Sequence, residues 1–259
     1  MALNILIIGD VVGKLGRRTV ASVLPGLRET KSVDLVIANG ENAAGGRGMT
    51  TETLEELRSA GVDVVTSGNH IWARREFYPV LDDESAPVIR PLNYPDGVPG
   101  RGIHRDGDVA VVNLIGRTFM GDSVDCPFRG IDTALASLAN ASVIIVDMHA
   151  EATSEKVAMG HYLDGRVSAV VGTHTHVPTA DARVLPHGTA YVSDLGMVGA
   201  TNSVLGMEYR PVLERFLTQL PNRWDPVKTG PATFNSVFVT VDDAGHATTI
   251  ERVDCEVPA

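Results

Sequence analysis

The stretch Leu3-Asn-Ile-Leu-Ile-Ile-Gly-Asp10 is an apolar run that ends at a carboxylate. Two further apolar runs also end at a polar side chain: Val33-Asp-Leu-Val-Ile-Ala-Asn-Gly-Glu41 and Val62-Asp-Val-Val-Thr-Ser-Gly-Asn69. Near-continuous Val, Ile and Leu runs of this length are typical of buried strands in a largely parallel sheet. The intervening segments 17–27 and 51–60 are compatible with helices, the second with a start signal at Thr50. The sequence therefore predicts an α/β fold.

Further strand-like runs begin near Val109, Val143 and Val167. After about residue 185 the runs become shorter and are joined by turns, with Asp242–Gly245 as a hairpin connection. The Pro- and Gly-rich stretch Pro91–Gly107 is expected to be a loop. We expect one domain over residues 1–259, with an α/β first part closed by a more antiparallel second sheet.

The composition excludes several function classes. The chain has 259 residues, 22 basic against 32 acidic side chains and a formal charge of −10. Such an acidic chain is a poor binder of nucleic-acid backbones, so no stable DNA binding is expected. A small phosphate ester remains possible, because bound dications invert the local field. Cys126 and Cys255 are too few for a disulfide framework or a sulfur-ligated zinc site.

The amino-terminal residues lack the basic segment and long apolar stretch of a signal peptide. No apolar run approaches the ~20 residues that cross a bilayer. The sequence predicts a soluble cytoplasmic protein without membrane association.

Nitrogen and oxygen ligands follow the ends of five expected strands. His149 lies in Asp147-Met-His-Ala, and Gly172-Thr-His-Thr-His176 follows the apolar run Val167–Val171. At the end of a strand, residues two apart point to the same side, so His174 and His176 can converge on one point. Carboxylate, amide oxygen and imidazole suit Mn²⁺, Fe or Zn²⁺. The candidate ligands are Asp10, Glu41, Asn69, His149, His174 and His176.

A two-metal phosphoesterase site places its ions roughly 3.5–4 Å apart and needs a bridging ligand. Glu41 is the candidate, since it lies in chain order between Asp10 and Asn69. Water held between two dications becomes a hydroxide that attacks phosphorus in line. His70 is then placed to give the leaving oxygen its proton, although it could instead only orient Asn69.

Arg117 and Thr118 follow the expected strand Val109–Leu114 and are candidate phosphate contacts. The alternative is an ordinary exposed arginine at the end of a strand.

Five blocks in order resemble the calcineurin-like metallophosphoesterases: Gly9-Asp10, Asn39-Gly-Glu-Asn42, Gly68-Asn-His70, His149 and Gly172-Thr-His-Thr-His176. Three positions depart from that superfamily pattern. Val12 stands where it has His, Glu41 replaces the bridging Asp, and Ile71 follows the Asn-His pair.

With these three departures, the sequence resembles one subgroup, the bacterial YmdB-like cyclic-nucleotide phosphodiesterases. Asn39-Gly-Glu-Asn-Ala-Ala44, Gly68-Asn-His-Ile-Trp72 and His149-Ala-Glu-Ala-Thr-Ser-Glu-Lys156 match its signature segments. The match continues through Asp194-Leu-Gly-Met197, so the resemblance covers nearly the whole chain.

The resemblance implies a four-layer α/β/β/α sandwich of two mixed sheets flanked by helices, with a di-metal site. One ion would be held by Asp10, Glu41 and His176, and the other by Glu41, Asn69, His149 and His174. Because Val12 cannot ligate, Asn42 would complete the first ion's shell. His70 falls on the family's proton donor, and the implied substrates are 2′,3′- and 3′,5′-cyclic nucleotide monophosphates.

Two other functions remain open at this point. The same site could serve a phosphomonoesterase or 5′-nucleotidase, or a metal-binding regulatory protein with weak catalysis. Loss of His70 or of the bridging carboxylate would mark the regulatory protein, and neither is lost. Fe or Mn is the expected metal, with Zn as an alternative. The sequence leaves the oligomeric state undecided, with a homo-oligomer as one option.

Overall fold

The fold is built around a five-stranded sheet in the order β14-β13-β1-β3-β4, in a computed structural model that describes residues 2–259. Its strands are β1 (Leu3–Ile8), β3 (Leu35–Asn39), β4 (Val64–Thr66), β13 (Ser236–Val241) and β14 (Ala247–Arg252). β1, β3 and β4 are parallel, whereas β13 and β14 run antiparallel to their neighbours. Along β1, Ile5 and Ile7 face one apolar core and Leu6 and Ile8 face another. A strand buried on both faces explains its near-continuous apolar sequence.

A six-stranded sheet packs against the first in the order β5-β6-β7-β8-β10-β9. Strands β6, β7, β8 and β10 are parallel, and the edge strands β5 and β9 are antiparallel. The two sheets share a buried core that includes Ile5, Ile37, Ile145 and Val171. The strands are β5 (Ile103–Asp106), β6 (Val109–Ile115), β7 (Val143–His149), β8 (Ala169–Thr173), β9 (Arg183–Val184) and β10 (Ala190–Val192).

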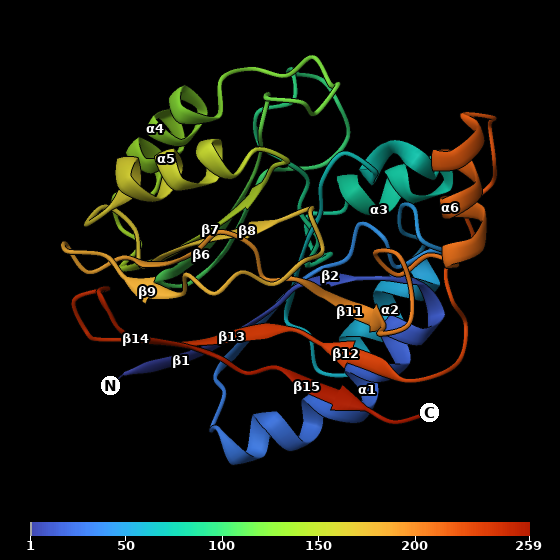
Figure 1. Ribbon diagram of the computed structural model, residues 1–259. Coiled ribbons are helices and arrows are strands. Elements are labelled where there is room, and N and C mark those ends of the chain that lie inside the picture. The colour runs from blue at the N-terminus through green and yellow to red at the C-terminus, as the bar shows by residue number, and fades with distance from the viewer. Residues whose placement is uncertain (1) are drawn as a thin grey trace.

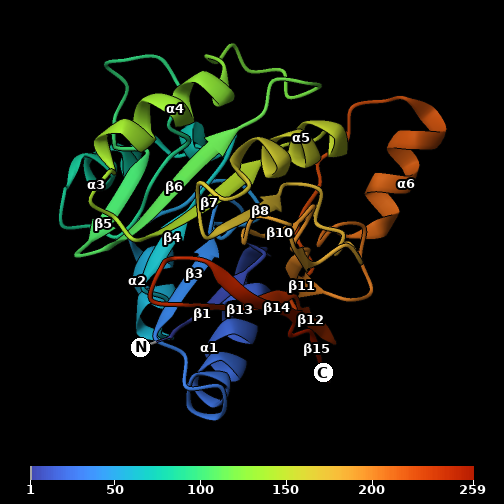
Figure 2. The same ribbon diagram turned by 90° about the vertical axis from the view of Figure 1, so that its left-hand side faces the viewer.

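Helices cover the outer face of each sheet (Figure 2). Val20 of α1 and Leu54 of α2 pack on the first sheet, and Ile131 of α4 and Met159 of α5 pack on the second. The four-layer sandwich of two mixed sheets is therefore confirmed. The helices are α1 (Gly13–Thr30), α2 (Thr51–Ser59), α3 (Tyr78–Asp82), α4 (Pro127–Ser137), α5 (Thr153–Leu163) and α6 (Tyr209–Thr218), with 3₁₀ turns at Ile71–Ala73 and Arg75–Phe77.

The predicted helix starts are partly right. Thr50 caps α2, because its hydroxyl accepts from the Thr53 backbone while the Thr53 hydroxyl accepts from the Thr50 backbone. Helix α1 extends beyond the expected 17–27 at both ends, with Pro25 inside it. Within residues 2–259 no helix has the length and apolar character needed to cross a membrane.

A third, four-stranded sheet continues the first in the order β15-β12-β11-β2. β2 follows β1 in the chain, and β12 precedes β13. The paired strands β1 and β13 separate beyond Ile8 and Ser236, and β11 lies between their continuations β2 and β12 (Figure 1). Gly9 lies at this separation. A Cβ there would lie 2.1 Å from the Gly196 carbonyl oxygen, so only glycine permits the approach. The strands are β2 (Asp10–Val11), β11 (Met197–Ala200), β12 (Ala232–Phe234) and β15 (Cys255–Val257).

Two sequence expectations are only partly right. Among the carboxyl-terminal strands, β11, β12 and β15 pair antiparallel in the third sheet. However, β13 pairs with β1 along its whole length and belongs to the first sheet, while β10 joins the second in parallel. The stretch 91–107 is not entirely a loop, because Ile103–Asp106 pairs with β6 as an edge strand. In both cases the pairing depends on tertiary contacts, so local patterns could not reveal it.

Candidate metal centre

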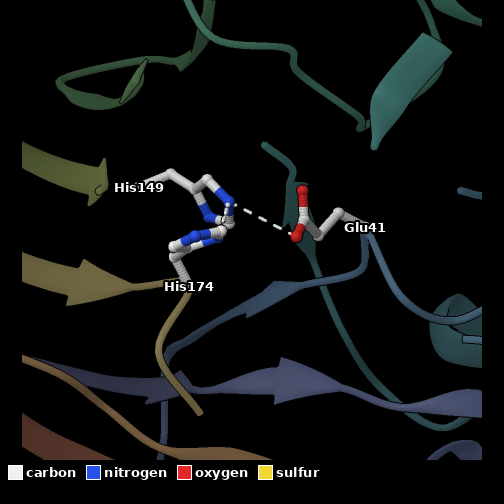
Figure 3. Close-up of side chains that lie close together, drawn as sticks. All are labelled: Glu41, His149 and His174. Carbon is white, nitrogen blue, oxygen red and sulfur yellow. Dashed lines mark hydrogen bonds and ion pairs between the residues drawn. The ribbon is translucent and has the colours of Figure 1, made fainter. Parts of the chain in front are cut away.

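The predicted ligands come together at one edge of the two facing sheets. Asp10 lies two residues beyond the end of β1, after Gly9, and Glu41 lies two residues beyond the end of β3. On the second sheet, His149 is the last residue of β7 and His174 follows β8. Figure 3 shows Glu41 and these two histidines pointing toward one another. Parallel strands bring their carboxyl ends to the same edge, which is how ligands far apart in sequence meet.

One group of donors surrounds His149. Its Nε2 lies 3.3 Å from Glu41 Oε1, 3.1 Å from His174 Nδ1 and 3.0 Å from Asn69 Oδ1. Single ligand atoms of Glu41, His149 and His174 all lie within 4.8 Å of one another. His149 and Glu41 are buried, being 0% and 1% exposed. The structure thus brings together all four residues expected around one ion.

A second group surrounds Asp10. Its Oδ1 lies 3.7 Å from His176 Nε2, and it is buried with no hydrogen-bond partner. An unpartnered buried carboxylate oxygen is costly, and a bound cation would remove that cost. His176 Nδ1 lies 3.1 Å from the Leu205 carbonyl oxygen, so Nδ1 carries the proton and Nε2 presents a lone pair toward Asp10.

Hydrogen bonds fix the tautomers of the other two imidazoles. The Thr173 hydroxyl donates to Asp147 at 2.7 Å, so it accepts from His149 Nδ1 at 2.9 Å. His174 Nε2 donates to Glu151 at 3.1 Å. His149 Nε2 faces the bare Nδ1 of His174 as well as Glu41 Oε1, so without a metal a proton on Nε2 occupies this point, and a bound cation would replace that proton. The donor set therefore fits a metal ion.

Burial and the charges of neighbouring groups shift the pKa values of these side chains strongly. Burial raises the pKa of Asp10 to about 7, against the lowering effect of His176. Burial disfavours the charged forms of Glu41 and His149, but each stabilises the other. The pKa of Glu41 falls below its usual range and that of His149 rises to about 9. Burial and the neighbouring His149 lower the pKa of His174 to about 3, which keeps it in the neutral, ligating form.

The Gly68-Asn-His70 motif needs its glycine for space. A Cβ at position 68 would lie 2.2 Å from His149 Nε2 and 2.3 Å from Glu41 Oε2. Any side chain there would occupy the centre of the site. The absent side chain of Gly68 is therefore what lets Asn69 approach His149.

The loop that carries His174 and His176 is held by a buried acid. Both histidines have left-handed backbone, with φ of 97° and 63°. Asp194 Oδ2 accepts from the Thr175 backbone at 3.2 Å and from the Thr175 hydroxyl at 2.6 Å. The same oxygen lies 2.7 Å from Lys156 Nζ in a buried ion pair. This pair stabilises a conformation that non-glycine residues disfavour.

His70 lies beside the donors with its ring partly exposed. Its backbone N–H donates to Glu41 Oε2 at 3.1 Å, and its Nδ1 donates to Asn42 Oδ1 at 3.0 Å. The Asn42 amide nitrogen lies 3.2 Å from Glu41 Oε1 and 3.1 Å from His176 Nε2. Asn42 thus turns its nitrogen to the donors. Ligation through Asn42 requires the amide to turn over so that its oxygen faces the ion.

The donors open into a cavity of about 620 Å³. His70, His174 and Arg47 are among the residues that line it. Arg117 and Thr118 are exposed after β6, where their backbone N–H groups donate to the Glu155 carboxylate at 3.1 and 3.2 Å. They are not among the described residues that line this cavity. Among the described residues, Arg47 is the lysine or arginine that lines the cavity.

The sequence interpretation missed the residues that support the ligands. Asp147 is 3% exposed and accepts hydrogen bonds from Asn39 and Thr173. Burial raises the pKa of Asp147, and these hydrogen bonds oppose the rise. A signal existed, because Asp147 interrupts the apolar strand two residues before His149 and so faces the same side. Asp194 stands in the family segment Asp194-Leu-Gly-Met197, but no local pattern indicated its supporting role, and none marked Arg47.

The sandwich with its nitrogen and oxygen donors at the strand ends defines a metallophosphoesterase. The sequence profile of the YmdB-like protein family matches residues 6–253. The chain belongs to this family and is a phosphoesterase enzyme.

Three similar proteins support this assignment. The 2′,3′-cyclic-nucleotide 2′-phosphodiesterase of Bacillus subtilis (strain 168) is 45% identical over 257 residues, which cover 97% of this chain and 96% of that protein. A crystal structure of a hypothetical protein from Thermus thermophilus is 46% identical, with a TM-score of 0.92 over 99% of this chain and 100% of that one. A crystal structure of a phosphatase from Mycoplasma pneumoniae is 31% identical, with a TM-score of 0.92 over 99% and 94% of the two chains.

Proposed function

We propose that this chain is a metal-dependent phosphodiesterase that hydrolyses cyclic nucleotide monophosphates, both 2′,3′ and 3′,5′. The observation that carries the proposal is the convergence of His149 Nε2, His174 Nδ1 and Glu41 Oε1 beside the unpartnered Asp10 Oδ1. The name of the Bacillus subtilis relative supports a diester substrate. We expect the enzyme to work in the cytoplasm and to carry iron or manganese, with zinc also compatible.

The ligands divide into two sets that share one carboxylate. Asp10, Glu41 and His176 would hold one ion, with Asn42 after its amide turns over. Glu41, Asn69, His149 and His174 would hold the other. A pair of cations bound there supplies a hydroxide nucleophile near neutral pH and neutralises charge on the phosphoryl oxygens.

His70 would give the leaving oxygen its proton. Its Nδ1 is engaged by Asn42, and its backbone N–H is engaged by Glu41, so the ring is held in place from two sides. With the Asn42 amide turned over, its nitrogen would donate to His70 Nδ1, so Nε2 would carry the proton toward a substrate in the cavity that His70 lines. Arg47 is the phosphate contact that we favour over Arg117 and Thr118, because it lines the same cavity.

Elemental analysis and a substrate comparison test the proposal. Purified protein should contain about two ions per chain, as two-metal phosphoesterase sites do. Turnover of 2′,3′-cyclic AMP and 3′,5′-cyclic AMP should exceed that of 5′-AMP. Faster turnover of 5′-AMP would favour a phosphomonoesterase. Undiminished diester turnover after metal removal would overturn metal dependence.

A further inference from the structure

The cavity beside the metal centre has a second wall of different chemistry. It is formed by residues of the segment 201–231 between β11 and β12. This segment includes α6 (Figure 1). Phe216 and Trp224 line the cavity from this wall, although they are 69% and 46% exposed. Large exposed aromatic side chains gathered in a cavity mark a binding surface rather than a core.

The aromatic wall is held in place at its base. The Asn222 side-chain nitrogen donates to the Pro211 carbonyl at 3.3 Å and to Glu214 Oε2 at 3.0 Å, which folds the chain after α6 back onto the helix. His176 donates to the Leu205 carbonyl at 3.1 Å, so the same segment is tied to the metal centre. The wall and the donors therefore line one cavity.

We propose that Phe216 and Trp224 form a nucleobase subsite, on which the base of the substrate stacks while its phosphate lies at the metal ligands. This inference rests on the proposed function. A cyclic nucleotide has an anionic end and a flat, weakly polar end, and the cavity offers donors for the first and aromatic faces for the second. Stacking on aromatic side chains tolerates any base, because every base has a π-face. Purines should bind better than pyrimidines, since they cover more ring area.

A matched pair of variants tests the subsite. Phe216→Ala/Trp224→Ala removes both cavity aromatics. Tyr209→Ala/Leu217→Ala is the control, because these side chains are 50% and 76% exposed on the same helix but lie outside the cavity lining. The substrates are 2′,3′-cyclic AMP and glycerol 1,2-cyclic phosphate, which has the five-membered cyclic diester and no base.

The cavity variant should raise KM for 2′,3′-cyclic AMP by about tenfold, with kcat within about twofold. Its kcat/KM for glycerol 1,2-cyclic phosphate should stay within about twofold of the wild-type value, because that substrate has no base to stack. The control variant should change neither substrate. An unchanged KM for 2′,3′-cyclic AMP, or an equal loss on both substrates, would overturn the subsite while leaving the proposed function intact.

A binding measurement separates failure of the subsite from failure of the proposed function. If wild-type protein turned over neither diester, the proposed function would fail, but adenosine should still quench tryptophan emission through Trp224. That quenching should disappear in Trp224→Leu, which retains Trp72. No quenching in the wild type would overturn the subsite. Light scattering should give equal masses for wild type and the cavity variant, and a changed mass would overturn the subsite by assigning the effect to assembly.

Discussion

The two walls of the same cavity are constructed in opposite ways. On the metal side, Asp10, Glu41 and His149 are between 0% and 1% exposed. Each follows or ends a buried strand of the sandwich. On the other side, Phe216 and Trp224 belong to a segment whose helix stands apart from both sheets, and they are 69% and 46% exposed (Figure 2).

The difference reflects what each wall has to do. Converging lone pairs must be fixed within a fraction of an ångström, and buried polar groups must all be satisfied, so the metal side is built on strands with an extensive hydrogen-bond network. A stacking surface needs only a flat apolar area. Substitutions on the metal side should therefore change chemistry and metal affinity, whereas substitutions on the aromatic side should change substrate preference alone.

The largest effect is expected from Glu41→Gln, which keeps the side-chain shape but removes the shared negative charge. Metal content should fall from about two ions to below one per chain, and turnover should fall by more than about a thousandfold. Elemental analysis together with steady-state assays measures both. Full metal content in this variant would remove Glu41 from its bridging role.

His70→Ala should lower turnover of 2′,3′-cyclic AMP by about 10²–10⁴-fold and leave the metal content unchanged. The loss should be much smaller with bis(4-nitrophenyl) phosphate, whose leaving group needs no proton. Comparing the two substrates therefore separates proton donation from positioning. Equal losses on both substrates would show that His70 acts by positioning its neighbours.

Asp147→Asn probes the network behind His149. Because Thr173 would lose its carboxylate acceptor, His149 Nδ1 would be oriented less firmly, and metal affinity should fall by about 10–100-fold. Competition with a chromogenic chelator measures this affinity. The control is Asp132→Asn on α4, whose carboxylate is 43% exposed and pairs with Arg166. Unchanged affinity in Asp147→Asn would mean that packing alone orients His149.

The smallest effect is expected from Phe216→Ala on the aromatic side. Because the side chain is mostly in solvent, the free energy of unfolding should change by less than about 0.5 kcal/mol. Urea denaturation followed by circular dichroism measures it. A loss of about 2 kcal/mol or more would show that Phe216 packs as a core residue and would erase the contrast between the two walls.

The candidate ligands could be proposed from the sequence because each one carries a local signal. Asp10, Glu41 and His149 each end an apolar run, and His174 follows another, so strand pattern and residue type together mark the positions. No such signal indicates that Asp194 supports the histidine loop or that Arg47 lines the cavity. Their roles come from residues that are distant in the chain.

The aromatic wall shows the opposite case. Phe216 and Trp224 lie in a segment without strand or metal-ligand pattern, and nothing in it indicates that it borders the site. The pairing of β13 with β1 could not be predicted for the same reason, because the two strands lie near opposite ends of the chain. Pairing partners and cavity walls depend on contacts between residues far apart in sequence.

By itself, the sequence determined the α/β class, most strand and helix positions and the identity of the donors, since these follow from apolar periodicity and side-chain chemistry. Only the tertiary structure decided which strands pair, which imidazole nitrogen faces the site and what lines the far wall. Those features depend on where distant backbone and side-chain groups come to lie, and no local pattern of residues encodes that.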